Sequence, residues 1–487
     1  MFALLLLAGC ALGPDFASPP PPDLTRYTDT PLAPATASAE TQAGEAQYFA
    51  IGRDIPGEWW TLFHSRHLNR LIEQAIAENG NLQAAQHTLE QARENAAAQA
   101  GTLLPTLDAN SSQQRQQFSP AQFGQSGPPI LFNLFNATVN VSYAVDVFGG
   151  KRRALEASVA QADYQRFQVE ATFLTLTANV VTTAIQEASL RGQIKATEDI
   201  IKSQTEQLQV VRGQFDLGGA SRADVLAQEA DLAATQATLP PLEKQLEQQR
   251  SLLATLVGRP PSEADREAFT LATLALPQKL PLTVPSRLVQ QRPDIRAAEE
   301  QLHQASANIG VAKANLLPQF NITGDYGSTA TKIGSLFSPT TAIWSIGSSA
   351  AQPLFHGGTL IHQERAAVAA FEAAKAQYRD TVLNALRNVS DSLRAIQSDA
   401  VTLRAQERAA RTASDSFNLA REQFRTGAIT YLTLLNAQRT QQQALIGLAQ
   451  VQAARYADTA ALFQALGGGW WNRTDVPARD SAVALIQ

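Results

Sequence analysis

Few side chains of this sequence have the types and spacing that catalysis or metal binding requires. The chain of 487 residues holds six histidines and a single cysteine, Cys10. His64 and His67 are separated by two residues, but no cysteine or carboxylate cluster near them in the sequence completes a metal site. Acidic pairs such as Glu299 and Glu300 have the pattern of a solvated helix face. We therefore expect no metal or other cofactor, and packing roles for the two histidines.

Motifs of common enzyme classes are missing from the sequence. It contains no phosphate-binding Gly-x-x-x-x-Gly-Lys-Ser/Thr loop, no Gly-x-Ser-x-Gly nucleophile turn and no His-Glu-x-x-His zinc motif. The formal net charge is −5 and the basic residues are scattered, so the chain offers no basic field to a nucleic acid. We expect a protein that is not an enzyme and does not bind nucleic acid.

Cys10 has the clearest chemical role. A single cysteine cannot form an internal disulfide, and Leu7-Ala8-Gly9-Cys10 has the form of a bacterial lipobox, in which the cysteine becomes the lipidated N-terminus. A chance cysteine in a signal-like segment is the alternative. A secretory signal has a basic start and roughly 15–30 residues, whereas residues 1–9 contain neither Lys nor Arg. We expect residues 1–9 to be the remnant of a signal peptide whose true start lies upstream.

Beyond its start, the chain contains two copies of one plan. Residues 81–105 align without a gap with residues 294–318, and both stretches end in Leu-Leu-Pro. Residues 212–228 align in the same way with residues 421–437. Two copies this long indicate a duplicated structural unit, not a solenoid of short repeats.

The order of predicted elements is the same in each copy. A helical segment with apolar residues at helical spacing comes first, at 65–101 and 287–314. Residues 135–147 then alternate apolar and polar side chains, as a strand that crosses a bilayer does. Proline-free stretches of good helix formers predict very long helices, each followed by a glycine turn and a returning helix. The predicted strands are 106–118, 133–147, 318–330 and 343–355, the long helices 150–213 and 358–426, and the returning helices 222–257 and 431–466.

These elements divide the chain into two structural repeats behind a tether. Residues 10–50 are rich in Pro, Ala, Ser and Thr, which predicts an extended, lipid-anchored tether without a core. The first repeat and a connector cover 51–285, the second repeat covers 286–469, and 470–487 form a C-terminal tail. In each repeat, two short helices stacked end to end would match one long helix in length.

Strands that cross a membrane must pair along both edges of their sheet. After its start, the sequence has no apolar run of the roughly 18 residues that a membrane helix needs, so a membrane role would rest on lipid or on strands. The predicted strands of one chain cannot close a membrane barrel, since known barrels begin at about eight strands. Two copies of the chain would supply eight strands and three would supply twelve. An ordinary soluble hairpin in each repeat is the alternative.

Several motifs resemble those of one known family, the outer-membrane factors or TolC-like exit ducts of tripartite efflux systems. The similarity is closest to their lipoprotein branch, which is OprM-like or NodT-like, and it covers nearly the whole mature chain. The motifs are CALGPDF at the start, VPSRLVQQRPDIRAAEEQL at 284–302, FRTGAITYLTLLNAQR at 424–439 and ALGGGWW at 465–471.

The resemblance implies a mainly helical fold with membrane β-strands. In this arrangement a homotrimer forms a twelve-stranded outer-membrane β-barrel that continues into a long periplasmic α-barrel. An equatorial belt, to which 258–285 and the tail after Leu466 contribute, would surround the middle. The implied function is a passive exit duct for small molecules, with a periplasmic adaptor, an inner-membrane transporter and outer-membrane lipid as partners. The duct of a type I protein secretion system and a lipid-anchored stalk without a channel are the alternatives.

The resemblance also assigns roles to residues at two turns. Gly218, Gly219 and Gly427 lie where a long helix must reverse, and glycine permits the positive φ that such a turn needs. Both turns would lie at the periplasmic tip and dock the adaptor, together with Arg222, Phe424 and Arg425. Simple helix ends are the alternative.

The acidic tie that closes this tip in the family is not expected to form here in full. Asp224 matches a residue of the family that bonds to a Tyr and an Arg of the other turn in the closed state. Phe424 and Ile429 occupy those two positions here, and their side chains cannot hydrogen-bond. We therefore expect Asp224 to pair, if at all, with Arg222 or Arg425.

A gate is expected next to the second turn. Leu432 matches an apolar ring of the family, and Asn436 replaces the acidic residue of a ring one helix turn further on. Because residues four apart share a helix face, both side chains are expected to point into the pore, which would close mainly by apolar contact at Leu432. Alternatively, Leu432 packs between helices and Asn436 is solvated.

Overall fold

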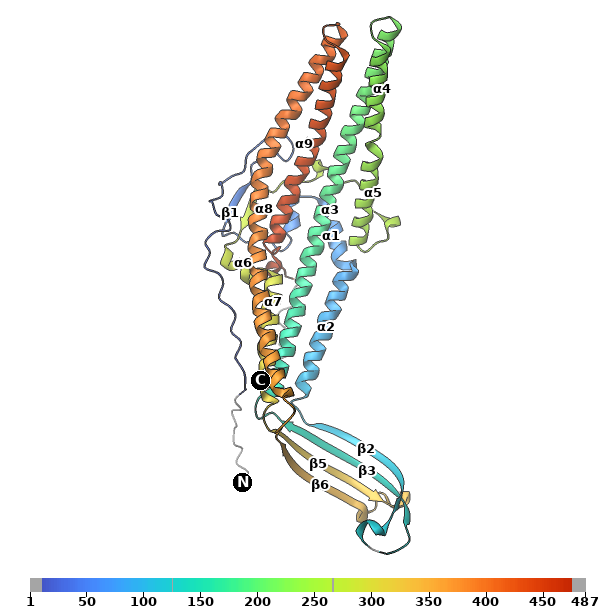
Figure 1. Cartoon of the computed structure of the whole chain (residues 1–487), viewed down its shortest axis with the longest axis vertical. Coiled ribbons are helices and arrows are strands. Elements are labelled where there is room, and N and C mark those ends of the chain that lie inside the picture. Colours follow the sequence, from blue (N-terminus) through green and yellow to red (C-terminus); the bar gives the residue numbers. More distant parts are fainter. Residues whose placement is uncertain (1–10, 125, 265–266, 475–487) are drawn as a thin grey trace.

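The computed structural model describes residues 11–124, 126–264 and 267–474. The molecule is elongated, with a helical part at one end and a four-stranded sheet at the other (Figure 1). Two helices of 67 residues, α3 (Gly150–Asp216) and α8 (Thr359–Arg425), run the length of the helical part. The expected mainly helical fold with antiparallel strands is confirmed. No helix in the described ranges combines the length and the mean hydropathy that crossing a membrane requires.

Shorter helices stack end to end beside the two long ones (Figure 1). One column packs on α3 and consists of α2 (Gly80–Gly101), α5 (Leu239–Leu256) and α4 (Arg222–Gln236). The other column, α7 (Pro293–Ala314) and α9 (Tyr431–Ala465), packs between α3 and α8. The helices therefore form one layer whose two edges are α8 and the α2–α5–α4 column.

The first expected helix, 65–101, is two helices. The chain forms α1 (Arg66–Glu78) and then α2, because Asn79 ends the first helix and caps the second. The Asn79 side-chain oxygen accepts hydrogen bonds from the backbone N–H groups of Asn81 and Leu82, at 3.0 and 3.1 Å.

Prolines divide two further helices that the sequence analysis treats as continuous. The returning helix expected over 222–257 is split into α4 and α5, whose first turn contains Pro240 and Pro241. The segment expected over 287–314 consists of α6 (Pro285–Gln291) and α7, which begins at Pro293. Proline lacks the N–H that a helix interior requires but fits the first turn, so each of these prolines starts a new helix.

Strands from both copies form one antiparallel sheet in the order β2, β3, β5, β6. Strand β3 ends before the expected residue 147 because the Asp146 carboxylate accepts hydrogen bonds from the N–H groups of Lys151 and Arg152 at the start of α3, at 2.9 and 3.0 Å. Strand β6 ends before residue 355, ahead of Pro353, which has no N–H for a sheet. The strands are β2 (Thr106–Phe118), β3 (Ile130–Val145), β5 (Gln319–Ala330) and β6 (Ala342–Ala351).

The two faces of this sheet differ in polarity. The strand register places Val139, Tyr326 and Trp344 side by side on one face, and all three are exposed. On the opposite face, Asn140 lies opposite Asp325. The apolar face continues through the exposed side chains of Leu107, Val141, Ile322 and Ile346. A continuous exposed apolar face of this kind indicates an apolar surrounding.

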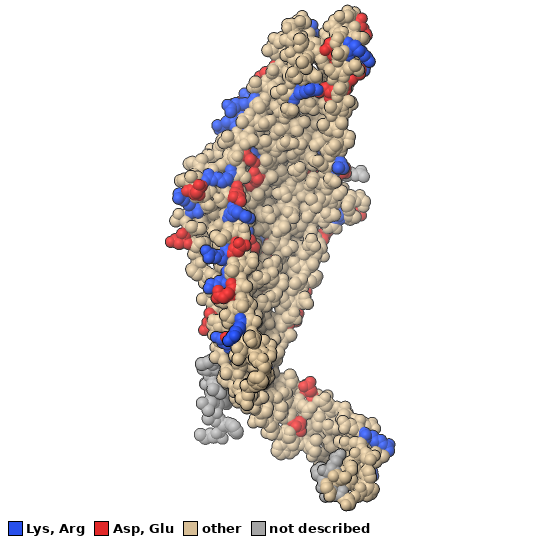
Figure 2. Space-filling view, viewed as in Figure 1, with Lys and Arg blue, Asp and Glu red and all other residues tan. Residues whose placement is uncertain are grey.

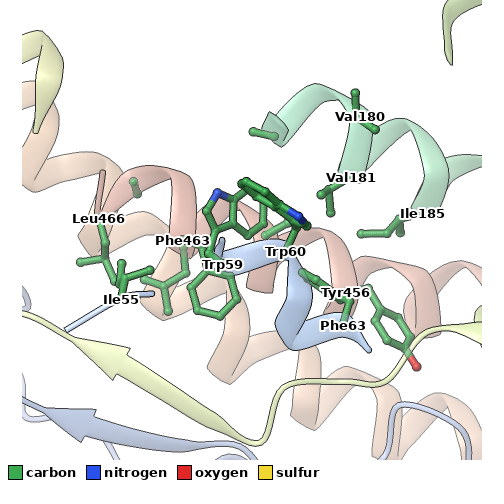
Figure 3. Close-up of a cluster of buried hydrophobic side chains, with 14 of the residues drawn as sticks. Ile55, Trp59, Trp60, Phe63, Val180, Val181, Ile185, Tyr456, Phe463 and Leu466 are labelled. Atoms are coloured by element: carbon green, nitrogen blue, oxygen red, sulfur yellow. The ribbon is translucent and has the colours of Figure 1, made fainter. Parts of the chain in front are cut away.

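The main hydrophobic core lies at the middle of the helical part. Trp59 and Phe63 are fully buried and pack with Phe463 of α9 (Figure 3). Strand β1 (Tyr48–Ile51) pairs in parallel with β4 (Lys279–Leu282) at the same level. His67 stacks on Phe269 with ring centroids 4.2 Å apart, which gives this histidine a packing role. We call this region, with the 258–285 connector, the belt.

The segment expected as an extended tether over residues 10–50 is extended in its described part, residues 11–50, which we call the strap, but it lies against the helices. The strap runs beside the helical part (Figure 1) and is fixed by ion pairs from Asp15 to Arg153 and from Asp29 to Arg394, both 2.6 Å. A proline-rich segment has no core of its own, but here it packs on helices that follow more than a hundred residues later. Cys10, residues 1–9 and residues 475–487 lie outside the described ranges.

The acidic pair Glu299 and Glu300 is buried, which corrects the expected solvated face. Glu299 binds Arg296 at 2.5 Å and accepts a hydrogen bond from the Ser18 hydroxyl of the strap. Glu300 lies 3.3 Å from Nδ1 of His303. This contact, and a second one to Glu156 on α3, raise the pKa of His303 against the opposing effect of burial. The strap and α3 supply partners that helix periodicity alone does not reveal.

Near the belt, Asp458 of α9 titrates with a shifted pKa, which predicts a pH-dependent stability. Burial first, and then the hydrogen bond and charge of Asp399, raise the pKa of Asp458 from 3.8 to about 7. The native state therefore binds more protons than the unfolded state, and stability falls as the pH rises from about 4 to about 7.

We expect Asp458→Asn to raise the Tm at about pH 8 and to change it much less at about pH 4, because asparagine removes the proton uptake. Thermal melts of the detergent-solubilised protein at both pH values measure this difference. The same substitution at the exposed Asp415 is the matched control, for which little change is expected. Equal Tm shifts for Asp458→Asn at both pH values would contradict the prediction.

Candidate functional site at the helical tip

Two turns of the same geometry reverse the chain at the end of the molecule away from the sheet (Figure 1). Gly218 has φ +76°, and its N–H donates to the Phe215 carbonyl at 3.0 Å. Gly427 has the same φ, +76°, and its N–H donates to the Phe424 carbonyl at 2.9 Å. Gly219 adopts no positive φ and continues the first turn. The left-handed conformation explains glycine at 218 and 427.

Asp224, which matches the acidic residue of the family's tie, caps its own helix. The Asp224 carboxylate accepts hydrogen bonds from the N–H and the hydroxyl of Ser221, at 2.9 and 2.7 Å, in a capping box. Arg425 pairs with Glu422, 3.2 Å away on its own helix. Within the part of this chain that the structure describes, Asp224 therefore bonds to Ser221, and its pairing with Arg222 or Arg425, expected only if Asp224 pairs with an arginine at all, stays a prediction.

Phe424 and Ile429 have packing roles in the tip. Phe424 is half-buried, and its ring lies edge-on to Tyr431 with centroids 5.7 Å apart. Ile429 packs against the cluster of Phe417 and Leu434 between α8 and α9. These apolar contacts stand at the positions where the resemblance implied hydrogen-bonding side chains. Arg222, at the first position of α4, is exposed.

Leu432 and Asn436 share one exposed face of α9, as helix periodicity predicts. Leu432 is 62% exposed and Asn436 is also exposed, whereas Leu434 and Leu435 are buried. Within this chain Leu432 therefore does not pack between helices. An exposed leucine next to an uncharged amide can line an aqueous path without binding an ion.

Below the turns, a series of hydrogen bonds between buried polar side chains joins the two helical hairpins. The sequence analysis did not predict it. The Tyr431 hydroxyl donates to the Gln228 side-chain oxygen, and the Gln228 amide donates to the Gln204 carbonyl at 3.2 Å. Asp231, which is buried, accepts from the Gln204 amide at 2.8 Å and from Arg439 Nε at 2.7 Å. Burial first, and then nearby carboxylates, raise the pKa of Tyr431. These contacts fix α4 against α9, so the two turns are positioned as one unit.

The sequence contains a pattern that indicates these buried hydrogen bonds. Arg439 follows Asn436 by one helix turn, and Gln228 and Asp231 are three apart on the returning helix of the first copy. Where polar residues occupy helix positions that normally hold buried apolar residues, they indicate hydrogen-bond partners on a neighbouring element. The partner element, however, cannot be read from the spacing.

No group of three or more potential metal ligands occurs among the residues that the structure describes. The tip instead combines glycine turns, packed aromatic side chains and an exposed leucine–amide pair.

Comparisons with known proteins show the family of this chain. The sequence matches the family described as "Outer membrane efflux protein" over residues 71–259 and 284–468. This chain belongs to that family. It is an outer-membrane efflux channel and not an enzyme, which confirms the function that the motifs implied.

Individual members of the outer membrane efflux protein family match nearly end to end. The chain is 30% identical over 455 residues to the pyoverdine export outer membrane protein OpmQ of Pseudomonas putida, covering 92% of this chain and 96% of the relative. It is 28% identical over 493 residues to the toluene efflux pump outer membrane protein TtgC of the same species, covering 98% and 96%. The structure superposes on the outer-membrane channel OprN with a TM-score of 0.85 at 29% identity, covering 95% of this chain and all of that one.

Proposed function

We propose that three copies of this chain form the passive exit duct of a tripartite efflux pump. The sheet would insert in the outer membrane and the helices would reach into the periplasm, where the tip would dock an adaptor linked to an inner-membrane transporter. Lipid on Cys10 would add a second anchor. The transporter would supply the energy and the small-molecule cargo.

The unpaired edges of the chain carry this proposal. Strands β2 and β6 each pair on one side only within the described residues, and every residue of β6 is exposed. Open strand edges in lipid would leave backbone N–H and C=O groups without partners. Strand β2 follows α2 and β6 leads into α8, so each free sheet edge continues into a free edge of the helix layer. A copy related by rotation can therefore extend both layers at once.

Ring closure requires more than one copy of the chain; two copies would also reach about eight strands, and the number three follows from the family resemblance. Three chains would bring twelve strands, above the minimum of about eight for a membrane barrel. The exposed apolar face of Val139, Tyr326 and Trp344 would then contact lipid, and the opposite face with Asn140 and Asp325 would contact water. The proposed gate consists of Leu432 and Asn436 on the exposed face of α9, near Asp224.

The mass and conductance of the purified protein test the oligomer. Native mass spectrometry in detergent should give three times the mass of one mature, lipidated chain, and the same sample should form ion-conducting pores in planar bilayers. A monomer without conductance would contradict the duct and favour a lipid-anchored stalk. Purification with the adaptor identifies the pump, and a peptide-exporting pump would contradict small-molecule cargo.

Lipidation predicts two independent modes of membrane attachment. We expect Cys10→Ser to remove the acyl chains while the protein stays in the outer membrane, because closure of the sheet buries its edges without help from lipid. Mass spectrometry of the N-terminal peptide and membrane fractionation measure the two effects. A Cys10→Ser protein that fractionates as soluble would contradict membrane insertion by the strands.

The two positive-φ glycines give a prediction on docking. A Cβ at Gly218 or Gly427 would meet no atom within 4 Å, so valine there costs backbone strain, about 1–2 kcal/mol, without a collision. We expect Gly218→Val and Gly427→Val to abolish efflux by reshaping the tip while trimers still assemble. Asparagine, which tolerates the left-handed region, is the matched control and should retain most efflux. Loss of trimers in the valine variants would make the turns merely structural.

A further inference from the structure

A polar hollow of about 440 Å³ lies between α2, α3 and α7. Its volume falls within the roughly 300–1,000 Å³ of small-molecule pockets. None of the side chains that line it carries a charge, and more than half are amides. The amides are Gln91, Asn95, Gln99, Gln161, Gln165, Gln304 and Asn308.

The hollow opens on the face of the helix layer that is turned away from the strap. On α7, Leu302 and Ser306 line the groove under the strap, whereas Gln304 and Asn308 line the hollow. Residues two apart on an α-helix point roughly 200° apart, so the hollow and the strap lie on opposite faces.

The same face carries the proposed gate. On α9, Arg455 binds the strap through the carbonyl oxygens of Ala43 and Glu45. Gln452 of α9 also binds the strap, by donating to the Thr41 hydroxyl. Asn436 and Leu432, which precede Gln452 by 16 and 20 residues, lie roughly 160° around the helix from it. The hollow and the gate residues are therefore both turned from the strap.

Charged side chains of the same helices avoid the hollow. Arg153 and Glu156 of α3 pair at 2.7 Å, and Glu156 also contacts His303 of α7 at 3.0 Å. None of these three residues lines the hollow. Figure 2 shows charged residues gathered along α8, while the surface over α3 carries few.

We propose that this hollow, repeated in each subunit around the lumen, transiently binds uncharged solutes that both donate and accept hydrogen bonds. The inference rests on the proposed function, which turns this face to the lumen. Each side-chain amide donates through its NH₂ group and accepts through its oxygen, so a neutral polar solute can exchange bonds to water for bonds to the wall. A charged solute finds no opposite charge there to replace its hydration.

Solute block of single channels tests this site. We use maltotriose as the neutral probe, and citrate and spermidine as the charged probes, on purified trimers in planar bilayers. Maltotriose should interrupt the current of the wild type at lower concentrations than either charged probe. In Gln161→Leu/Asn308→Leu, the half-blocking concentration of maltotriose should rise about ten-fold through lost hydrogen bonds. Gln377→Leu, an exposed amide on α8 outside the hollow, should leave it unchanged.

A charge-adding variant separates failure of the site from failure of the lumen assignment. Gln161→Glu/Asn308→Asp keeps the shapes but adds negative charge, and it should shift the reversal potential toward cation selectivity if the face lines the lumen. An unchanged reversal potential would overturn the orientation in the proposed function. A shifted reversal potential together with equal maltotriose block in the wild type and the leucine variant would overturn the binding site alone.

Discussion

Replacing Arg455 with methionine is expected to loosen the strap and lower the Tm more than any other single change on the outer side of the helices. Arg455 is 1% exposed, and its guanidinium donates to the Ala43 carbonyl and the Gln47 side-chain oxygen, both at 2.7 Å. Methionine keeps much of the aliphatic packing but leaves these buried acceptors without donors, which costs about 1–3 kcal/mol for each group. Thermal melts measure the loss.

Proteolysis shows whether the strap is the part that loosens. Arg26 lies in the exposed middle of the strap, so trypsin should cleave there faster in Arg455→Met than in the wild type. Arg394→Met is the matched control, because Arg394 also binds the strap, through Asp29, but is 43% exposed. An exposed ion pair contributes about 0–1 kcal/mol, so this variant should melt nearly like the wild type. Equal melting of both variants would contradict a special role for Arg455.

Local patterns predict the sheet and the turns of this fold well. The alternation around Val139 and Val141 specifies which face of β3 is apolar, because side chains in a strand alternate whatever the partner strand is. Glycine at 218 and 427 is equally local, since the positive φ of one residue requires it. The helix break at Asn79 was also readable, because an asparagine before Gly80 is a common cap.

Contacts between segments that are far apart in the sequence cannot be predicted from local patterns. The strap looks like a linker because its composition gives it no core, yet the buried Arg153 and Arg455 bind it from helices far along the chain. The tie between Asp231 and Arg439 is hidden for the same reason, since it joins one repeat to the other. Periodicity predicts that such polar residues face a neighbour, and only the fold supplies the neighbour.

A substitution that opens the proposed gate is expected to change the conductance strongly. We expect Leu432→Ser to raise the conductance of the isolated trimer severalfold, because a ring of leucines closes a pore by excluding water and serine readmits it. Leu419→Ser is the matched control, since Leu419 is 60% exposed, close to the 62% of Leu432, but lies on α8. Single-channel recording of both variants measures the difference. Equal conductance of Leu432→Ser and the wild type would place the constriction elsewhere.

Charge at the same constriction predicts the direction of ion selectivity. Asn436 is uncharged, and Arg439, one helix turn further on, is neutralised by Asp231 at 2.7 Å, so the proposed ring carries no net charge. Asn436→Asp would add one negative charge per subunit next to Leu432, where a narrow passage concentrates the field on passing ions. We expect the reversal potential in a salt gradient to shift toward cations, and more strongly at low ionic strength, since salt screens the added charge. Asn436→Ser, which adds no charge, should leave the reversal potential unchanged, and an equal shift in both variants would assign the effect to side-chain size.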